Sequence, residues 1–338
     1  MKLDTSGLLK KYGLLLVVLG LIAVAALLSP LFLTQRNLVN LLTQVSFIGI
    51  IAVGMTVVIL TGGIDLSVGS IVGFSSIFFA TMLHGNLFTW MPDEIFVYEG
   101  GTALTPLLPL PLNLLVVLLV GALFGLISGT MAYLLKLHPF IITLGMMIFV
   151  RGLGLSYTDG QPLFGVPAYT NTLAYGTVLG MPMPVILWII TLAVAWTVLR
   201  YTRFGRRIYA VGGEEEAARL SGIQPALYRI APFVISGLCA AMVGVLMTGR
   251  LAGGDPKIAE AWELDAIGAV VIGGTSLHGG KGGVAGKILG VLIVGIVVNV
   301  MNLLGIETHP QEMVKGALIV GAVALQNLLG RAAKEPVV

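Results

Sequence analysis

The chain has 338 residues, of which 57% are hydrophobic and only 10% are charged. An ordinary soluble domain is about 25% charged, so this composition excludes that class and predicts an all-α polytopic membrane protein forming a single domain over residues 1–338. The net charge of +3 gives no argument for a nucleic-acid partner. The single cysteine, Cys239, can form neither an internal disulfide nor a paired-cysteine metal site.

Apolar runs predict about ten transmembrane helices, most of them near the ~20 residues that a crossing needs. The first run, Leu14 to Leu28, follows two lysines as in a signal peptide, but its small-residue stretch lies inside the run, so we expect a retained span. The eighth run is too short to cross alone and predicts a re-entrant or broken helix. The predicted spans are 13–33, 45–62, 68–84, 112–135, 139–157, 183–201, 229–249, 263–275, 284–305 and 312–330.

The distribution of the 19 basic residues predicts the orientation of these spans. With a cytoplasmic N-terminus, the outer segments hold only Arg36, Arg250 and Lys257, and most of the others fall inside. Basic residues concentrate in cytoplasmic loops. We therefore expect both termini and residues 202–228 in the cytoplasm, and a long external loop over 85–111, in a bacterial inner membrane surrounded by lipid.

Two glycine-rich stretches follow apolar runs at the predicted inner face. Irregular backbone survives in a membrane only where protein or water shelters it, so both stretches are predicted to line the translocation path or its gate. The first runs from Gly62 to Ser70 and supplies Gly62, Gly63, Asp65 and Ser67; the second runs from Gly273 to Gly283 and supplies Gly274, Thr275 and Ser276.

Both copies of this pattern run in the same direction, Ile48-Gly49 leading to Gly62-Gly63 and Ile267-Gly268 leading to Gly279-Gly280. This order predicts a weak parallel internal repeat.

The second glycine-rich stretch also invites comparison with a phosphate-binding loop. Thr275 stands where the first glycine of that motif belongs, and Gly282 follows Lys281 where a magnesium-binding hydroxyl is needed. We therefore expect no cofactor and no nucleotide site in this chain. No hydrolytic, redox or metal-binding constellation appears either, so the chain is not expected to be an enzyme.

The largest cytoplasmic loop, 202–228, predicts a short amphipathic helix after Gly213. The three glutamates Glu214, Glu215 and Glu216 would occupy its first turn, where the helix dipole favours anions, and Gly222 stands at its C-terminal stop. Such a helix suits docking in a groove of a partner, although arginines that only fix the topology would explain the loop equally well. The predicted coupling residues are Gly213, Glu214, Glu215, Ala217, Ala218, Leu220, Ser221, Gly222 and Ile223, with Ala217, Leu220 and Ile223 as the apolar face.

Charged residues within or beside the predicted spans have two readings each. Arg151 lines a polar path, or it snorkels or pairs structurally, which is the more common case. Asp65 orients a gate, or Asp65 or Ser67 has an N-cap or glycine-turn role at the start of the third span, which is again the more common case. Asp265 is expected to cap the eighth span, and Lys315 to extend toward the external interface.

Fourth-span glycines at positions 121, 125 and 129 predict close helix packing, within one subunit or between two.

Several motifs in order resemble the ribose-type permease family, the membrane subunits of monosaccharide ATP-binding-cassette importers. The resemblance spans roughly Leu31 to Gly330. It rests on Val53-Gly54-Met55-Thr56, Leu60 to Ser70, Pro139 to Met147 with Arg151-Gly152, residues 202–223, and Glu263 to Gly283.

Membership would imply a partner ATPase, a periplasmic or lipid-anchored sugar-binding protein, and two copies of the permease. The family's coupling segment falls on Gly212 to Ile223, with Glu214 where the family commonly has Asn, and the loop around Trp90 to Pro111 is longer than usual.

The sequence therefore predicts a monosaccharide importer permease, most simply for ribose or a similar sugar, that acts as a homodimer. Two rivals stay open. One is a permease of the same superfamily for nucleosides or branched-chain amino acids. The other is an ion-coupled secondary transporter, which the scarcity of paired intramembrane charges disfavours.

Overall fold

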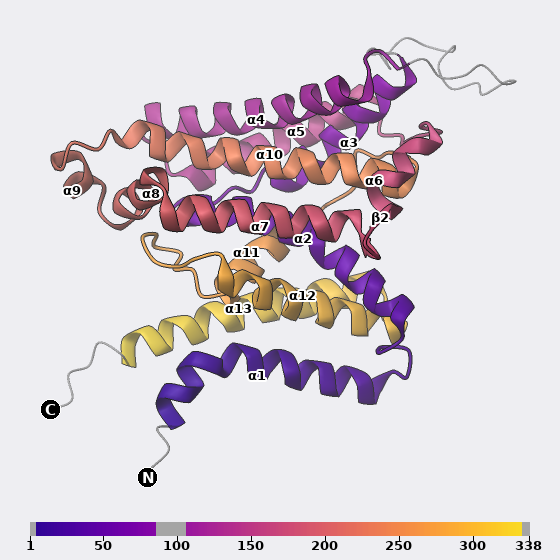
Figure 1. Ribbon diagram of the computed structural model, residues 1–338. Helices are drawn as coiled ribbons and strands as arrows, with labels where there is room; N and C mark the ends of the chain where they lie inside the picture. The colour runs from indigo at the N-terminus through magenta and orange to yellow at the C-terminus, as the bar shows by residue number, and fades with distance from the viewer. Residues whose placement is uncertain (1–4, 86–105, 333–338) are drawn as a thin grey trace, which may run out of the picture.

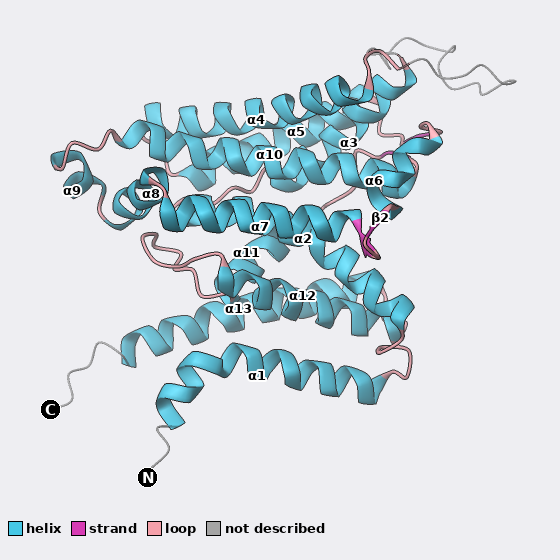
Figure 2. Cartoon of the chain, viewed as in Figure 1, coloured by secondary structure: helices cyan, strands magenta, loops and turns pink. Residues whose placement is uncertain are grey.

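The computed structural model describes residues 5–85 and 106–332, and nearly all of them are helical (Figures 1 and 2). Most of the predicted external loop lies outside the described residues. The helices are α1 (Thr5–Leu28), α2 (Gln35–Leu60), α3 (Val68–His84), α4 (Leu110–Leu134), α5 (Pro139–Tyr157), α6 (Asn171–Tyr175), α7 (Met183–Tyr201), α8 (Arg203–Gly213), α9 (Glu215–Leu220), α10 (Pro225–Leu251), α11 (Trp262–Ile272), α12 (Ala285–Leu303) and α13 (Thr308–Ala332), with a 3₁₀ turn at Ala168–Thr170.

Strand structure in the described part of the chain is limited to two short pairs. Strand β1 (Leu163–Phe164) pairs antiparallel with β4 (Gly253–Gly254), with Leu163 opposite Gly254. Strand β2 (Thr177–Val178) pairs with β3 (Met181–Pro182) in a hairpin. The prediction of an all-α fold is confirmed.

Every predicted span falls on a helix, and α3, α5 and α7 have the predicted bounds. The helix α2 begins at Gln35, well before the predicted residue 45, because the Thr34 side chain accepts a hydrogen bond from Asn37 N and caps a polar first turn. Among the described residues, six helices are long and apolar enough to cross a membrane: α2, α4, α5, α7, α10 and residues 286–303 of α12. The number of about ten crossings therefore stays a prediction.

Helix α10 lies at the centre of the fold, packed against α2, α3 and α4 (Figure 1). Close approach of α4 depends on its glycines, since a Cβ on Gly125 would overlap Phe233 O and one on Gly129 would lie 2.9 Å from Ile230 O. The glycines of α4 thus allow close packing against α10 of the same chain. Small residues at a helix interface allow this backbone proximity.

Two long helices are each followed by an irregular stretch and a short helix, and the two units run in opposite directions. Helix α2 runs toward the end of the molecule that carries α8 and α9, and residues 61–67 then lead back to α3. Helix α10 runs away from that end, and residues 252–261 lead back to α11. The two units touch where Gly73 of α3 passes Pro256 O, which a Cβ on Gly73 would approach to 2.9 Å.

At 11 residues, α11 spans only about 16 Å, so the prediction of a broken eighth span is confirmed. The parallel glycine pattern predicted from the sequence, which relates α2 to α11, is distinct from the two oppositely directed units. Both α2 and α11 lead into glycine-rich loops that meet, with Gly280 N donating to Leu60 O at 2.9 Å.

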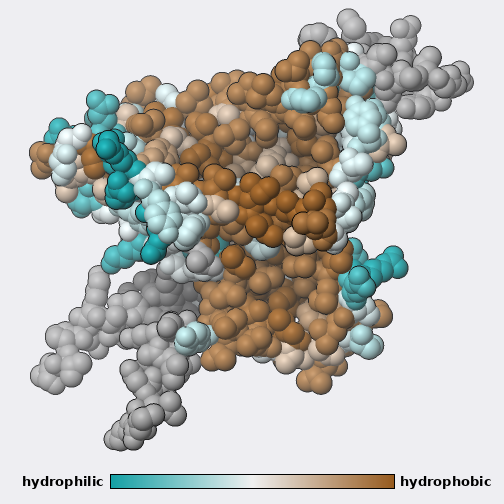
Figure 3. Space-filling model, in the orientation of Figure 1, coloured by the Kyte–Doolittle hydropathy of each residue, from teal (hydrophilic) through white to brown (hydrophobic). Residues whose placement is uncertain are grey.

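The start of α1 and the end of α13 lie at the same end of the molecule as α8 and α9 (Figure 1). Figure 3 shows an apolar surface over the helices between the two ends, with hydrophilic residues gathered toward the α8–α9 end and the opposite end. A continuous apolar surface of this kind is much larger than a soluble monomer exposes, and it is the surface that lipid covers in a membrane protein.

Candidate coupling junction and translocation elements

Residues 202–228 contain two helices where the sequence predicted one. Thr202 is the N-cap of α8, and its hydroxyl accepts a hydrogen bond from Gly205 N at 3.2 Å. Its inner face is Phe204, Ile208 and Val211, which pack against the core. The spacing of these three residues is typical of one face of a helix and could have predicted α8 from the sequence. The glycines and arginines between them made the pattern difficult to recognise.

Helix α9 follows at once and differs in detail from the prediction. Gly213 is the last residue of α8 rather than a residue before α9, and Glu214 is the extended N-cap, so only Glu215 and Glu216 lie in the first turn. The predicted stop is confirmed, because Gly222 has a φ of 80°, a left-handed conformation that glycine adopts without strain.

The predicted apolar face of α9 is only partly available to a partner. Leu220 is 77% exposed and Ala217 is exposed, whereas Ile223 packs against the core and Ala218 is buried. An exposed leucine on a short helix at the end of the molecule is the group that a partner surface would cover. The neighbouring residue Ser221 donates to Ala217 O at 2.9 Å and completes the last turn.

Two ion pairs hold α9, and they differ in exposure. Arg219 pairs with Glu216 on the outer face of the helix, where both side chains are about 60% exposed. The hydrogen bond between them is the main reason why the pKa of the Glu216 carboxyl is lowered and that of Arg219 is raised. Glu215, in contrast, accepts from Arg229 Nε of α10 at 2.9 Å.

Arg229 links helix α9 to the end of α2. Besides holding Glu215, its guanidinium donates to Thr61 O, in the turn that ends α2. Thr61 is buried and immediately precedes the Gly62-Gly63 pair. One side chain thus contacts both α9 and the turn that precedes the glycine pair. This contact could not be predicted from local sequence, since Arg229 and Thr61 are 168 positions apart.

Two glycine loops and the C-terminal end of α8 meet beside Arg229. A Cβ on Gly212, in the last turn of α8, would overlap Leu60 O, and a Cβ on Gly279 would lie 2.5 Å from Gly212 O. Tyr209 of α8 donates to Gly282 O at 3.0 Å. The loops after α2 and α11 are thus packed directly on the α8–α9 corner, and we call this the coupling junction (residues 60–63, 212–213 and 278–283).

The predicted path residues near α3 form a local turn. Asp65 is fully buried and its Oδ1 accepts from Ser67 N at 3.0 Å and from Ser67 Oγ at 2.6 Å. Asp65 thus holds the turn before α3, while Ser67 makes no side-chain cap of α3. A role of either residue at a gate stays a prediction. Gly62 and Gly63 belong to the coupling junction.

In the second loop, Gly274 is exposed with a φ of 85°, Thr275 is buried, and Ser276 Oγ accepts from His278 N at 3.3 Å. This loop and the Gly62–Ser67 turn lie at the same end of the fold. A role of either in the path stays a prediction.

Arg151 lies with a different set of groups. Its Nη1 donates to Pro256 O at 2.5 Å and to Ile258 O at 3.0 Å, in the irregular stretch before α11. Arg151 thus has structural partners, and a place for it in the translocation path stays a prediction. The guanidinium holds carbonyls that no regular helix satisfies, as buried backbone groups require.

Two sequence expectations about charges are wrong. Asp265 lies inside α11, whose N-cap is Ala261, and Lys315 does not extend to an interface. Instead, Lys315 Nζ and Asp265 Oδ2 form an ion pair at 2.8 Å, with side-chain exposures of 22% and 6%. The pair joins α13 to α11 across 50 positions. The expectation of no paired intramembrane charge is thus also corrected.

Within residues 5–85 and 106–332, no group of three or more His, Cys, Asp or Glu side chains could hold a metal ion.

The described residues combine long apolar helices, the short helix α11 and a polar corner at α8–α9. The chain belongs to the family described as branched-chain amino acid transport system / permease component, whose model matches residues 37–323.

Three curated relatives are similar over nearly their full length. The ribose import permease protein of Bacillus subtilis (strain 168) is 40% identical over 328 residues, which cover 96% of this chain and 95% of the relative. The D-allose transport system permease protein of Escherichia coli (strain K12) is 35% identical, with 95% and 93% covered. The galactose/methyl galactoside import permease protein of the same strain is 36% identical, with 95% of each covered. No solved structure matches the chain.

These comparisons make the chain a permease subunit of an ATP-binding-cassette importer and a transport component rather than an enzyme. Such a permease works in general with an ATPase and a binding protein. The ion-coupled rival loses its support, because the relatives are import permeases across the whole length of the chain.

Proposed function

We propose that this permease carries a monosaccharide, with ribose as the first candidate. The observation that carries the proposal is the set of relatives named for ribose, allose and galactose, all 35–40% identical over more than nine-tenths of the chain. The family description names branched-chain amino acids, so an amino-acid substrate is the second candidate.

Energy for transport comes from a separate ATPase that docks on α9. Support comes from the exposed Leu220 and Ala217 and from the link that runs from Glu215 through Arg229 to Thr61. ATP-driven motion of α9 would then move the glycine turn after α2. A transport cycle of this kind requires contacts that differ between two states.

The assembly is a homodimer in the bacterial inner membrane, with both termini and α8–α9 in the cytoplasm. One chain offers one coupling helix, so two copies related by a two-fold axis serve an ATPase pair most simply. The start of α1 and the end of α13 lie at the same end of the molecule as α9, which supports the orientation, as does the charge distribution. A periplasmic or lipid-anchored binding protein would dock at the opposite end.

Uptake by the reconstituted importer tests the substrate. The permease is purified with its ATPase and binding protein, placed in proteoliposomes, and supplied in turn with labelled ribose, allose, galactose and leucine. ATP-dependent uptake of a sugar supports the proposal. Uptake of leucine alone, or uptake driven by an ion gradient without ATP, refutes it.

Two further measurements test the assembly and orientation. Native mass spectrometry of the intact complex should show two copies of this chain, and a complex with one copy and no second permease refutes the homodimer. A Glu214→Cys variant should react with impermeant thiol reagents only from the cytoplasmic side. Reaction only from outside would overturn the orientation.

A further inference from the structure

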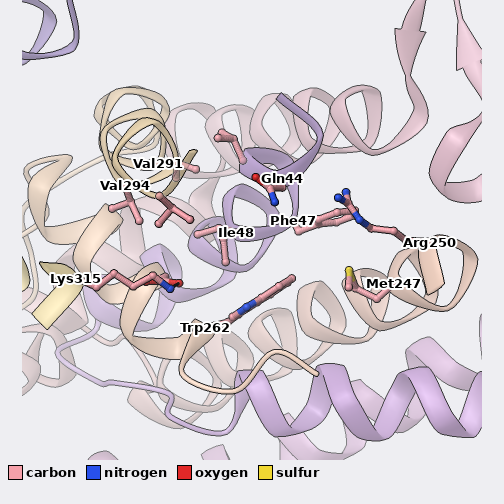
Figure 4. Close-up of a pocket in the computed structure, with 13 residues that line it drawn as sticks. Gln44, Phe47, Ile48, Met247, Arg250, Trp262, Val291, Val294 and Lys315 are labelled. Atoms are coloured by element: carbon pink, nitrogen blue, oxygen red, sulfur yellow. Dashed lines mark hydrogen bonds and ion pairs between the residues drawn. The ribbon is translucent and has the colours of Figure 1, made fainter. Parts of the chain in front are cut away.

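A cavity of about 230 Å³ opens between α2, α10, α11, α12 and α13, away from the predicted path loops (Figure 4). Its volume is several times the ~30 Å³ that one water occupies in the liquid. It is also smaller than the roughly 300–1,000 Å³ of pockets for drug-sized ligands. The cavity is therefore of a size for one small molecule.

Two aromatic rings and several aliphatic side chains, among them Ile48, Val291 and Val294, form the apolar part of the cavity. The rings of Trp262 and Phe47 are nearly parallel, with an interplanar angle of 22° and centroids 6.4 Å apart. Figure 4 shows Trp262 in the middle of the lining groups, with Arg250 and Met247 on one side and Lys315 on the other. Aromatic rings offer large apolar faces, and these match the C–H faces of a sugar ring.

Polar side chains enter the same cavity from four different helices. They are Gln44 of α2, Arg250 of α10, Asp265 of α11 and Lys315 of α13. Arg250 lies 5.4 Å from the Phe47 ring centroid. Within the described residues, the side chains of Gln44 and Arg250 make no hydrogen bond to the protein, so their donors remain available to a ligand.

Charges among apolar helices are costly, about 2.5–3.5 kcal/mol each on insertion scales, and they mark substrate pathways. Here a carboxylate, an ammonium, a guanidinium and an amide surround an aromatic pair. Together they supply hydrogen-bond donors and acceptors around the edge of a ring-shaped ligand and apolar contact to its face. A sugar ring has this same division, with hydroxyls around its edge and C–H groups on its faces.

We propose that this cavity is a binding station for the transported monosaccharide, with Trp262 against the sugar ring and Gln44, Arg250 and the Asp265–Lys315 pair on its hydroxyls. Phe47 is only 1% exposed and supports the Trp262 ring from behind. The proposal rests on the proposed function, since it takes the cargo to be a sugar. It adds that the permease itself contacts the cargo at a defined site.

Protection of an introduced cysteine tests the station. Val298 lines the cavity, and the native Cys239 is 6% exposed, so background labelling is low. In the complete importer in lipid nanodiscs, Val298→Cys should react with a small methanethiosulfonate, and D-ribose should slow this reaction. At ten times the concentration that gives half-protection, the rate should fall about tenfold by mass action.

Controls separate a binding role from a structural one. Leu179→Cys, on a loop residue that is 94% exposed, should label at the same rate with and without sugar. In the Val298→Cys background, Trp262→Leu should shift half-protection to at least about tenfold higher ribose, and Trp262→Tyr should restore most of it, because tyrosine keeps an aromatic face.

The outcomes separate this inference from the proposed function. Ribose uptake by the wild-type importer with no protection of Val298→Cys by ribose overturns the station and leaves the function in place. Protection by leucine but not by any of the three sugars overturns both. Equal protection in the Trp262→Leu and wild-type backgrounds refutes the assigned contact with the ring.

Discussion

Replacing Arg229 by methionine removes the link between the coupling helix and the end of α2 while keeping an unbranched apolar stem. The wild-type guanidinium holds Glu215 on α9 and the buried Thr61 carbonyl. We expect α9 to open more often in the variant, and we expect ATP hydrolysis to drive less uptake.

The size of the effect follows from the exposure of the two contacts. Arg229 and Glu215 side chains are 28% and 41% exposed, so solvent screening limits the ion pair to less than about 1 kcal/mol. A hydrogen bond from a charged donor contributes about 1.5–3 kcal/mol, and Thr61 is only 1% exposed. A total of about 2 kcal/mol corresponds to a roughly 30-fold change in the local opening equilibrium.

Hydrogen exchange of the α9 amides measures this equilibrium directly. Arg219→Met is the matched control, because Arg219 pairs with Glu216 on the same helix at about 60% exposure. Among the described residues, its side-chain hydrogen bonds go to Glu216 alone. Exchange in α9 should be faster by about 30-fold in Arg229→Met and nearly unchanged in Arg219→Met. Equal exchange in the two variants would refute the link.

Three other substitutions give separate expectations. Leu220→Asp should abolish uptake without reducing membrane insertion, because a charge at the ATPase contact costs several kcal/mol, and undiminished uptake would exclude a docking role. Gly212→Ala should destabilise the permease by about 1–3 kcal/mol in thermal unfolding, because its Cβ would overlap Leu60 O. The control Gly213→Ala should change the stability little, because its Cβ meets nothing within 4 Å. A larger loss of stability in Gly213→Ala than in Gly212→Ala would contradict the packing. Asp265→Asn should lower stability by about 3–5 kcal/mol by leaving a buried ammonium unpaired, and adding Lys315→Met should recover much of the loss, so additive losses would argue against the pair.

Local sequence features determined much of the helical framework. The apolar runs predicted the bounds of α3, α5 and α7, because the residues that flank each run end the apolar pattern sharply. Gly222 ended α9 as predicted, since only a left-handed conformation is needed there and glycine supplies it locally. The composition alone was sufficient for the class of membrane protein.

Tertiary structure decided which of the polar residues act together. Asp265 looked like a cap and Lys315 like an interfacial lysine, yet they pair because α11 and α13 pack side by side. The coupling junction likewise brings Leu60, Gly212 and Gly279 into contact. Neither residue type nor local period records a contact between positions that are 50 to 200 residues apart, because such contacts depend on how whole helices pack rather than on the dihedral angles of their neighbours.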